Sequence, residues 1–260
     1  MRNTPLLNKT ERSLKSSIKK LLVNKRKAII NQVIGDYEKL KKSDETGDIL
    51  DNLNFDNWGE FIPIIKKAIK TVATNSGENA IAYFGFEKAN PEITNIVNEK
   101  AVAFSEDRSA ELVGKKLIDG ELVDNPDAKW AITDSTREML RTNVQTAIEE
   151  GWSTKELSDA LENNYAFSDA RANTISRTEI ANAHVQGQMI SYRAAGVTKK
   201  TWVLGSESCD ECQDNAKAGE IDIDDDFPSG DEAPPAHPNC TCDVLPIIEQ
   251  IDNNDDNQEE

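Results

Sequence analysis

All four cysteines of the chain, and one of its two histidines, fall within a single stretch of 34 residues. The stretch begins with Cys209 and Cys212 and ends with His237, Cys240 and Cys242. Its C-x-x-C and H-x-x-C spacings each place two ligands at one turn, as tetrahedral zinc sites require. The spacing predicts a zinc site made by Cys209, Cys212, His237 and Cys240, in which Cys242 could replace His237.

Disulfides, or reduced thiols with a structural role, are the alternative interpretations of four cysteines. The N-terminus has basic residues but no apolar segment of the kind that directs secretion. We therefore expect a reducing cytoplasm, which favours metal over disulfides. A redox dithiol is a further alternative, but its C-x-x-C normally opens a helix in a βαβ setting, and the sequence pattern indicates none here.

Charge is distributed unevenly along the chain, whose net charge is −17. Residues 1–42 hold 12 Lys or Arg against 3 acidic residues, whereas residues 207–260 hold 18 acidic residues against one Lys. A basic arm on an acidic body suits non-specific contact with DNA or with an acidic protein, and a solvated lysine-rich helix face is the alternative. The candidate DNA-contacting residues are Lys15, Lys19, Lys20, Lys25, Arg26 and Lys27.

Helical periodicity dominates the first 195 residues, and no strand is needed there. A polar connector is expected over residues 43–58 and a Gly- and Pro-containing break, with a soft domain boundary, over residues 119–127. The expected helices cover residues 11–42, 61–72 with a small-residue continuation to 85, 90 to 112 or 117, 133–150, a shorter segment from 153, and 168–195.

The pattern changes after Gly196. Short β-type runs predict strands over residues 199–204, 220–223 and 241–247, separated by the metal-binding turns and an acidic loop. Trp202 and Phe227 suit the small core of this lobe better than a nucleic-acid stacking surface, because the surrounding charge would repel phosphate.

These patterns predict a mainly α protein, in which a helical body is followed by a small zinc-stabilised α+β or β-rich C-terminal lobe. The expected parts are a basic N-terminal helix over residues 1–42, a helical body over residues 43–196, a Cys/His lobe over residues 197–248 and a disordered acidic tail over residues 249–260. No apolar run is long enough to cross a bilayer.

The order of motifs resembles the phage head-morphogenesis family typified by the phage Mu F protein. The resemblance covers roughly residues 130 to 247 and is carried by the run over residues 170–180, which contains Arg177, Thr178 and Glu179, and by the His-Pro-Asn-Cys-Thr-Cys sequence that begins at His237. The chain departs from the family pattern at Thr241, where a basic residue is usual. It also departs at Ser176, which replaces a small apolar residue.

The resemblance implies a minor head protein of a tailed phage or prophage, present in few copies and associated with the portal vertex. It further implies portal or capsid partners, a role in head assembly or in passage of DNA, and a place in the capsid interior or at the portal vertex. Before assembly the protein would lie in the host cytoplasm. A structural role of this kind predicts that the protein is not an enzyme.

A zinc-dependent hydrolase acting on nucleic acid is the competing hypothesis, and a DNA-binding module acting through the basic helix is another. A hydrolase needs an open metal position and a general base, which only Glu179 and His184 could supply. Three thiolates and one histidine describe a closed structural site instead. We therefore interpret Arg177, Thr178 and Glu179 as part of a buried ion pair that holds their helix to the zinc lobe.

Overall fold

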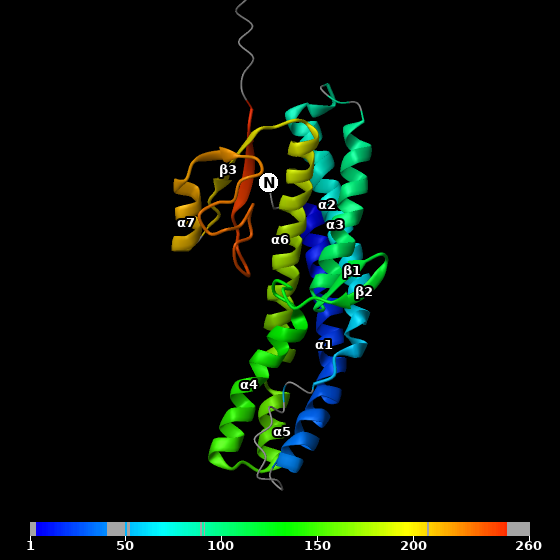
Figure 1. Cartoon of the computed structure of the whole chain (residues 1–260), viewed down its shortest axis with the longest axis vertical. Helices are drawn as coiled ribbons and strands as arrows, with labels where there is room; N and C mark the ends of the chain where they lie inside the picture. The colour runs from blue at the N-terminus through cyan, green and yellow to red at the C-terminus, as the bar shows by residue number, and fades with distance from the viewer. Residues whose placement is uncertain are drawn as a thin grey trace, which may run out of the picture.

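The computed structural model describes residues 4–40, 50, 53–88, 90, 92–206 and 208–248. It is mainly helical, as predicted, and Figure 1 shows an elongated bundle with a small lobe along one side of α6. The long helices are α1 (Pro5–Leu40), α2 (Phe61–Phe84), α3 (Ile93–Glu111) and α6 (Asp169–Ala194), and one end of the bundle is extended by α4 (Ile132–Glu150) and α5 (Thr154–Glu162). Short 3-10 turns are η1 (Asp56–Glu60), η2 (Phe86–Lys88) and η3 (Tyr165–Phe167).

Helix α1 begins at Pro5, earlier than the predicted start at residue 11. Pro5 takes the first helical position, where a missing N–H costs little, and the Thr4 hydroxyl accepts a hydrogen bond from the Leu7 N–H at 3.3 Å. The apolar face of α1 packs into the main core through Leu7, Leu14, Ile18, Leu22, Ile29, Ile30, Val33 and Tyr37. The end predicted at residue 42 and the first part of the predicted connector lie outside the described residues.

The later helices begin and end at residues suited to capping, close to the ends expected from the sequence. Ser153 and Glu156 form a capping box at the start of α5, and the Ser168 side chain accepts a hydrogen bond from a backbone N–H of α6. Gly151 and Gly196 follow α4 and α6 with φ of 71° and 76°, a left-handed conformation that glycine adopts without strain.

The prediction that no strand precedes residue 196 is wrong. Strands β1 (Lys115–Ile118) and β2 (Glu121–Asp124) pair as an antiparallel hairpin, so α3 ends at Glu111 and does not reach residue 117. Asp119 and Gly120 connect the strands with φ of 53° and 84°. Two consecutive positive φ angles define a type I′ turn, which matches the twist of a hairpin.

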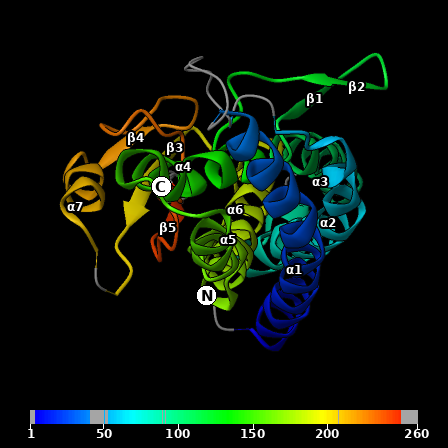
Figure 2. The same ribbon diagram turned by 90° about the horizontal axis from the view of Figure 1, so that it is seen from below.

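The C-terminal lobe contains all three predicted strands. They are β3 (Lys199–Val203), β4 (Glu220–Asp222) and β5 (Asp243–Ile247), in an antiparallel sheet of order β4-β3-β5. A short helix, α7 (Asp210–Lys217), lies between β3 and β4 and was not predicted. Figure 2 shows the lobe on one side of the bundle and the β1–β2 hairpin projecting from another.

No described helix combines the length and apolar character that a membrane span requires. The acidic tail predicted over residues 249–260 lies outside the described part of the chain.

Candidate metal centre

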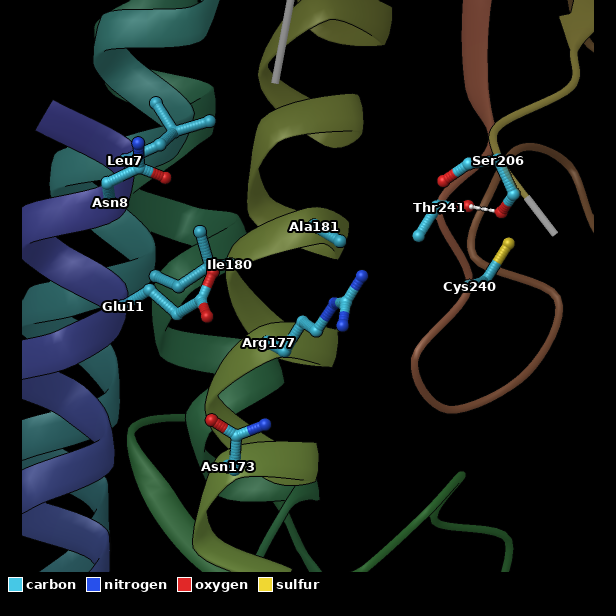
Figure 3. A pocket seen from close by; sticks show the side chains of 10 residues that line it. All are labelled: Leu7, Asn8, Glu11, Asn173, Arg177, Ile180, Ala181, Ser206, Cys240 and Thr241. Carbon is cyan, nitrogen blue, oxygen red and sulfur yellow. Dashed lines mark hydrogen bonds between the residues drawn. The ribbon is translucent and has the colours of Figure 1, made fainter. Parts of the chain in front are cut away.

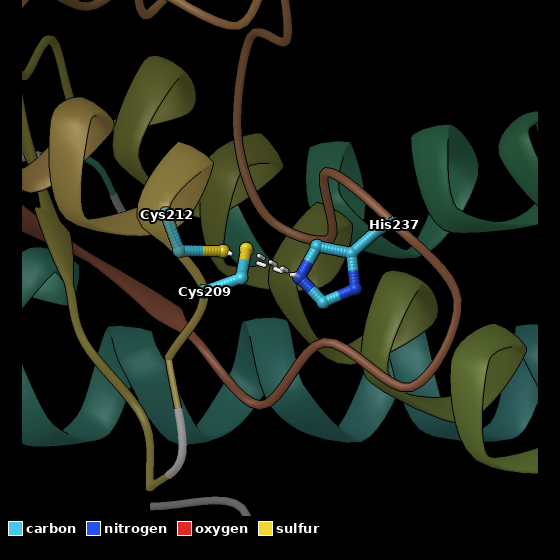
Figure 4. A group of neighbouring side chains, drawn as sticks. All are labelled: Cys209, Cys212 and His237. Carbon is cyan, nitrogen blue, oxygen red and sulfur yellow. Dashed lines mark hydrogen bonds between the residues drawn. The ribbon is translucent and has the colours of Figure 1, made fainter.

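Two segments of the lobe bring four of the predicted metal donors together. Cys209 is the N-cap of α7 and Cys212 lies in its first turn, while His237 and Cys240 lie in the loop before β5. The Nε2 atom of His237 is 3.3 Å from Sγ of Cys209 and 3.4 Å from Sγ of Cys212, as Figure 4 shows. Sγ of Cys212 is 3.7 Å from Sγ of Cys240.

These separations fit a tetrahedral zinc ion. Bonds of about 2.3 Å to sulfur and about 2.0 Å to nitrogen, at tetrahedral angles, place two sulfurs about 3.8 Å apart and a sulfur and a nitrogen about 3.5 Å apart. The observed sulfur–sulfur and sulfur–nitrogen distances are close to both values. The close donors form two groups that share Cys212, one with Cys209 and His237 and the other with Cys240 and Cys242. A single zinc ion held by all four predicted ligands would therefore require Cys240 to move closer to Cys209 and His237.

The orientation of His237 also suits metal binding. Its Nδ1 lies 3.0 Å from the backbone carbonyl oxygen of Pro238, which can only accept, so Nδ1 carries the proton and donates. Nε2 is then left with a lone pair directed at the two cysteine sulfurs. Such a second hydrogen bond is what fixes the tautomer of metal-binding histidines.

A second group of closely spaced donors is formed by Cys212, Cys240 and Cys242, all buried. Burial raises the pKa of Cys212 to about 12, and a hydrogen bond with Cys242, together with burial, raises the pKa of Cys240 well above its usual range. The hydrogen bond from Cys240 lowers the pKa of Cys242 to about 4. Without a cation, one thiolate of the three is favoured, and a bound metal would stabilise the others.

The alternatives to a metal fit the geometry less well. All four cysteines are free, and the 3.7 Å between the sulfurs of Cys212 and Cys240 far exceeds a disulfide bond of about 2.05 Å. The C-x-x-C does open a helix, contrary to our expectation. However, β3 and β4 on either side of α7 are antiparallel, so this helix is not the crossover of a βαβ redox unit.

The loop that carries His237 and Cys240 is held against the helical body. The backbone N–H of Asn239 donates to Thr178 Oγ1 at 3.0 Å, and the Asn239 side-chain amide donates to Thr174 Oγ1 at 3.2 Å. Thr178, from the predicted signature, thus connects α6 to the lobe.

Glu179 has a different partner from the predicted one. Its two carboxylate oxygens accept hydrogen bonds from Arg108 of α3, at 2.9 Å from Nε and 2.7 Å from Nη2, so the buried ion pair joins two helices of the body and does not hold α6 to the lobe. Burial would lower the pKa of Arg108, but attraction and hydrogen bonds from Glu179, and then Glu111, raise it above its ordinary value. Arg177 is exposed and faces the lobe.

His184 belongs to a buried polar group that the sequence pattern did not indicate. Its Nδ1 is 2.7 Å from the Ser76 hydroxyl on α2, and its Nε2 is 3.6 Å from a carboxylate oxygen of Asp243 on β5. The three residue types are those of a hydrolytic triad, but Ser76 is only 2% exposed and His184 only 5%, so a substrate has no access to them. Both carboxylate oxygens of Glu179 accept hydrogen bonds from Arg108, and His184 is buried. Glu179 and His184 therefore do not provide the general base that a metallohydrolase needs.

Most of the candidate DNA-contacting residues are engaged within the protein. Lys15 and Lys19 both pair with Asp169 at 2.9 Å, Lys25 pairs with Glu60 at 2.9 Å, and Arg26 donates to a backbone carbonyl of α5 at 3.2 Å. Lys20 and Lys27 are the remaining members of the set, and both are exposed.

The aromatic residues of the lobe form its core, as predicted. Trp202 and Phe227 pack edge to face with ring centroids 5.0 Å apart, and they share a buried cluster with Cys212, Cys240 and Cys242. They are 3% and 2% exposed, so neither offers a stacking surface to nucleic acid.

A family model described as phage Mu protein F like protein matches residues 138–245 of the chain. The matched region begins within α4 and includes α6, all five metal donors and most of β5. No curated protein and no solved structure gives a significant match.

Proposed function

Because the phage Mu protein F like model matches residues 138–245, we propose that the protein is a minor head protein of a tailed phage or prophage. In this role it binds portal or capsid proteins and assists head assembly, genome packaging or delivery of DNA. Its place is the capsid interior or the portal vertex, after assembly in the host cytoplasm.

The observation that carries this proposal is the match itself, which spans both the long helix α6 and the Cys/His lobe. The geometry supports a structural use of the domain. Cys209, Cys212, His237 and Cys240 would hold one zinc ion, which when bound supplies a crosslink between α7 and the loop before β5. Four protein ligands leave no position for a reacting water, which supports a non-enzymatic role.

A role in DNA contact through α1 has less support. Four of its six candidate residues bind acidic groups or a carbonyl within the protein, so phosphate would compete with these contacts, and only Lys20 and Lys27 would avoid that competition. Two phosphate contacts would give weak, salt-sensitive binding.

The test is reconstitution of procapsids. The protein is co-expressed with the portal, scaffolding and capsid proteins of a phage or prophage that carries its gene, and procapsids are isolated on a density gradient. We expect the protein in the procapsid fraction, in a few copies, and its loss when the portal protein is omitted. A folded, abundant protein that stays at the top of the gradient would overturn the proposal.

A further inference from the structure

A groove lies between the helical body and the lobe. Its cavity of about 520 Å³ is bounded by the first turns of α1, by one face of α6 and by the two lobe segments that carry Ser206 and Thr241 (Figure 3). A second cavity of about 290 Å³ shares Arg177 and Cys240 with it and continues toward the metal donors. Volumes in this range are typical of ligand sites.

Arg177 stands out among the cations of the protein because it projects from α6 into this groove. It is exposed, and its guanidinium makes no hydrogen bond or ion pair within the described part of the chain. Every other arginine in that part donates at least one hydrogen bond to a protein acceptor, namely Arg12, Arg26, Arg108, Arg137, Arg141, Arg171 and Arg193.

The rest of the groove combines apolar and polar surface. Ile180 and Leu7 line the wall next to Arg177 but are each only 3% exposed, and the polar side chains of Asn8, Glu11 and Asn173 also line the cavity. On the opposite side, the Thr241 hydroxyl donates to the Ser206 carbonyl at 2.8 Å and holds the two lobe segments together. An exposed guanidinium in a groove lined mainly by polar side chains matches a ligand that offers one carboxylate and further polar groups.

We propose that this groove binds a peptide segment of a partner protein through a carboxylate that Arg177 holds with two parallel hydrogen bonds. The identity of the partner as an assembly protein rests on the proposed function. A nucleic-acid ligand fits less well, because residues 208–248 of the lobe carry 11 acidic residues against one lysine and would repel a chain of phosphates. A single carboxylate of a peptide, by contrast, can be bound by Arg177 alone.

The experiment uses fluorescence anisotropy with the full-length protein and defined probes. The first probe is a labelled hexapeptide with a single glutamate among serine and leucine residues, the second is its glutamine counterpart, and the third is a labelled hexathymidylate. We expect the glutamate peptide to bind about tenfold or more tightly than the other two, the range expected for hydrogen bonds to charged groups. Arg177→Ala should remove this preference and Arg177→Lys should restore only part of it, since an ammonium cannot pair in the two-bond manner.

Arg141→Ala is the matched control, because Arg141 lies on α4, pairs with Glu138 three residues before it, and lines neither of the two cavities. It should bind all probes as the unmodified protein does, and circular dichroism should show all three variants folded. Equal affinity for the glutamate and glutamine peptides, an Arg177→Ala variant that keeps the preference, or tighter Arg177-dependent binding of the oligonucleotide would each overturn the proposal. A protein that binds the peptide but is absent from procapsids would refute the proposed function and leave the groove's ligand intact.

Discussion

Cys212 belongs to both groups of closely spaced metal donors, with Cys209 and His237 on one side and with Cys240 and Cys242 on the other. Replacing it should therefore remove metal whichever group binds. We expect Cys212→Ser to lower the zinc content from about one ion per chain to nearly none, because a serine hydroxyl is a much poorer ligand than a thiolate. Elemental analysis of protein purified under reducing conditions measures this.

The same measurement decides between the two candidates for the fourth ligand. His237 directs a lone pair at two sulfurs, whereas the sulfur of Cys242 already lies 3.9 Å from the Ser208 hydroxyl. We expect His237→Ala to lose zinc and Cys242→Ser to retain it. The opposite pattern would assign the position to Cys242.

The Arg108–Glu179 pair is buried, with side chains 6% and 2% exposed. Glu179→Ala leaves a buried guanidinium without its main partner, so we expect it to lower the free energy of unfolding by about 3–5 kcal/mol. Urea denaturation followed by circular dichroism gives this value. The control is Glu138→Ala, which breaks an ion pair on the surface of α4 and should cost at most about 1 kcal/mol. Similar losses in both variants would contradict the expected effect of burial.

Lys200 is fully buried in β3, where its Nζ donates to the Ile223 carbonyl at 2.8 Å. Burial, with a smaller contribution from Arg193, lowers its pKa to about 8 from 10.5. The unfolded chain therefore binds this proton more tightly than the folded protein does. Between about pH 8 and pH 10.5, Lys200 is neutral in the folded protein but still protonated in the unfolded chain, so stability rises with pH. Relative to Lys200→Met, the unmodified protein should gain stability over that interval in urea titrations, and a constant difference between the two proteins would rule out the shift.

At the scale of elements, α2 and α6 cross where two glycines allow close approach. A Cβ on Gly187 would lie 2.2 Å from the backbone oxygen of Ala73, and one on Gly77 would lie 2.4 Å from Val97. Since the first clash is with backbone, Gly187→Ala should force the helices apart and lower the thermal midpoint by several degrees.

Gly35 of α1 provides the matched control for this substitution, because a Cβ there would meet nothing within 4 Å. Gly35→Ala should stabilise the protein by up to about 1 kcal/mol through helix propensity alone. Calorimetry of both variants would show opposite shifts, and a Gly187→Ala protein as stable as the unmodified one would contradict the close packing.

Elements with local chemical signals could be predicted from the sequence, and those that depend on distant pairing could not. Helix ends at Ser153, Gly151 and Gly196 follow from capping chemistry within a few residues. The β1–β2 hairpin also carried a local signal, its Asp-Gly turn between apolar residues, but that signal was interpreted as a break between helices. The Arg108–Glu179 pair joins residues 71 positions apart, and no periodicity encodes such a partner.

The same distinction applies to the candidate metal site. The C-x-x-C and H-x-x-C spacings are local and predicted the donors, which the fold then gathers into two groups of three that share Cys212. Spacing did not predict that Asn239, between His237 and Cys240, would anchor this loop on Thr178 of α6. That contact depends on how the lobe docks on the body.

At the scale of the whole molecule, the lobe has its own aromatic and thiol core. It packs on α6 through a buried apolar cluster that includes Val244 of β5, and through polar contacts such as Asn239 with Thr178. A lobe with so small a core depends on its crosslink for stability, whereas the helical body has a large apolar core of its own. Metal removal should therefore open the lobe while the body stays folded.

Lys217 makes this prediction measurable, because it is the only lysine or arginine in residues 207–260 and it ends α7. With metal bound, trypsin should cut slowly there, since a protease needs extended backbone and α7 is held by Cys209 and Cys212. A chelator with reductant should speed this cut about tenfold or more, while helical circular dichroism changes little because α7 has only 8 residues. Added zinc should restore protection from trypsin, and Lys217→Gln should abolish the fragment that cleavage after Lys217 produces. Simultaneous loss of the whole helical signal on chelation would show instead that body and lobe unfold as one unit.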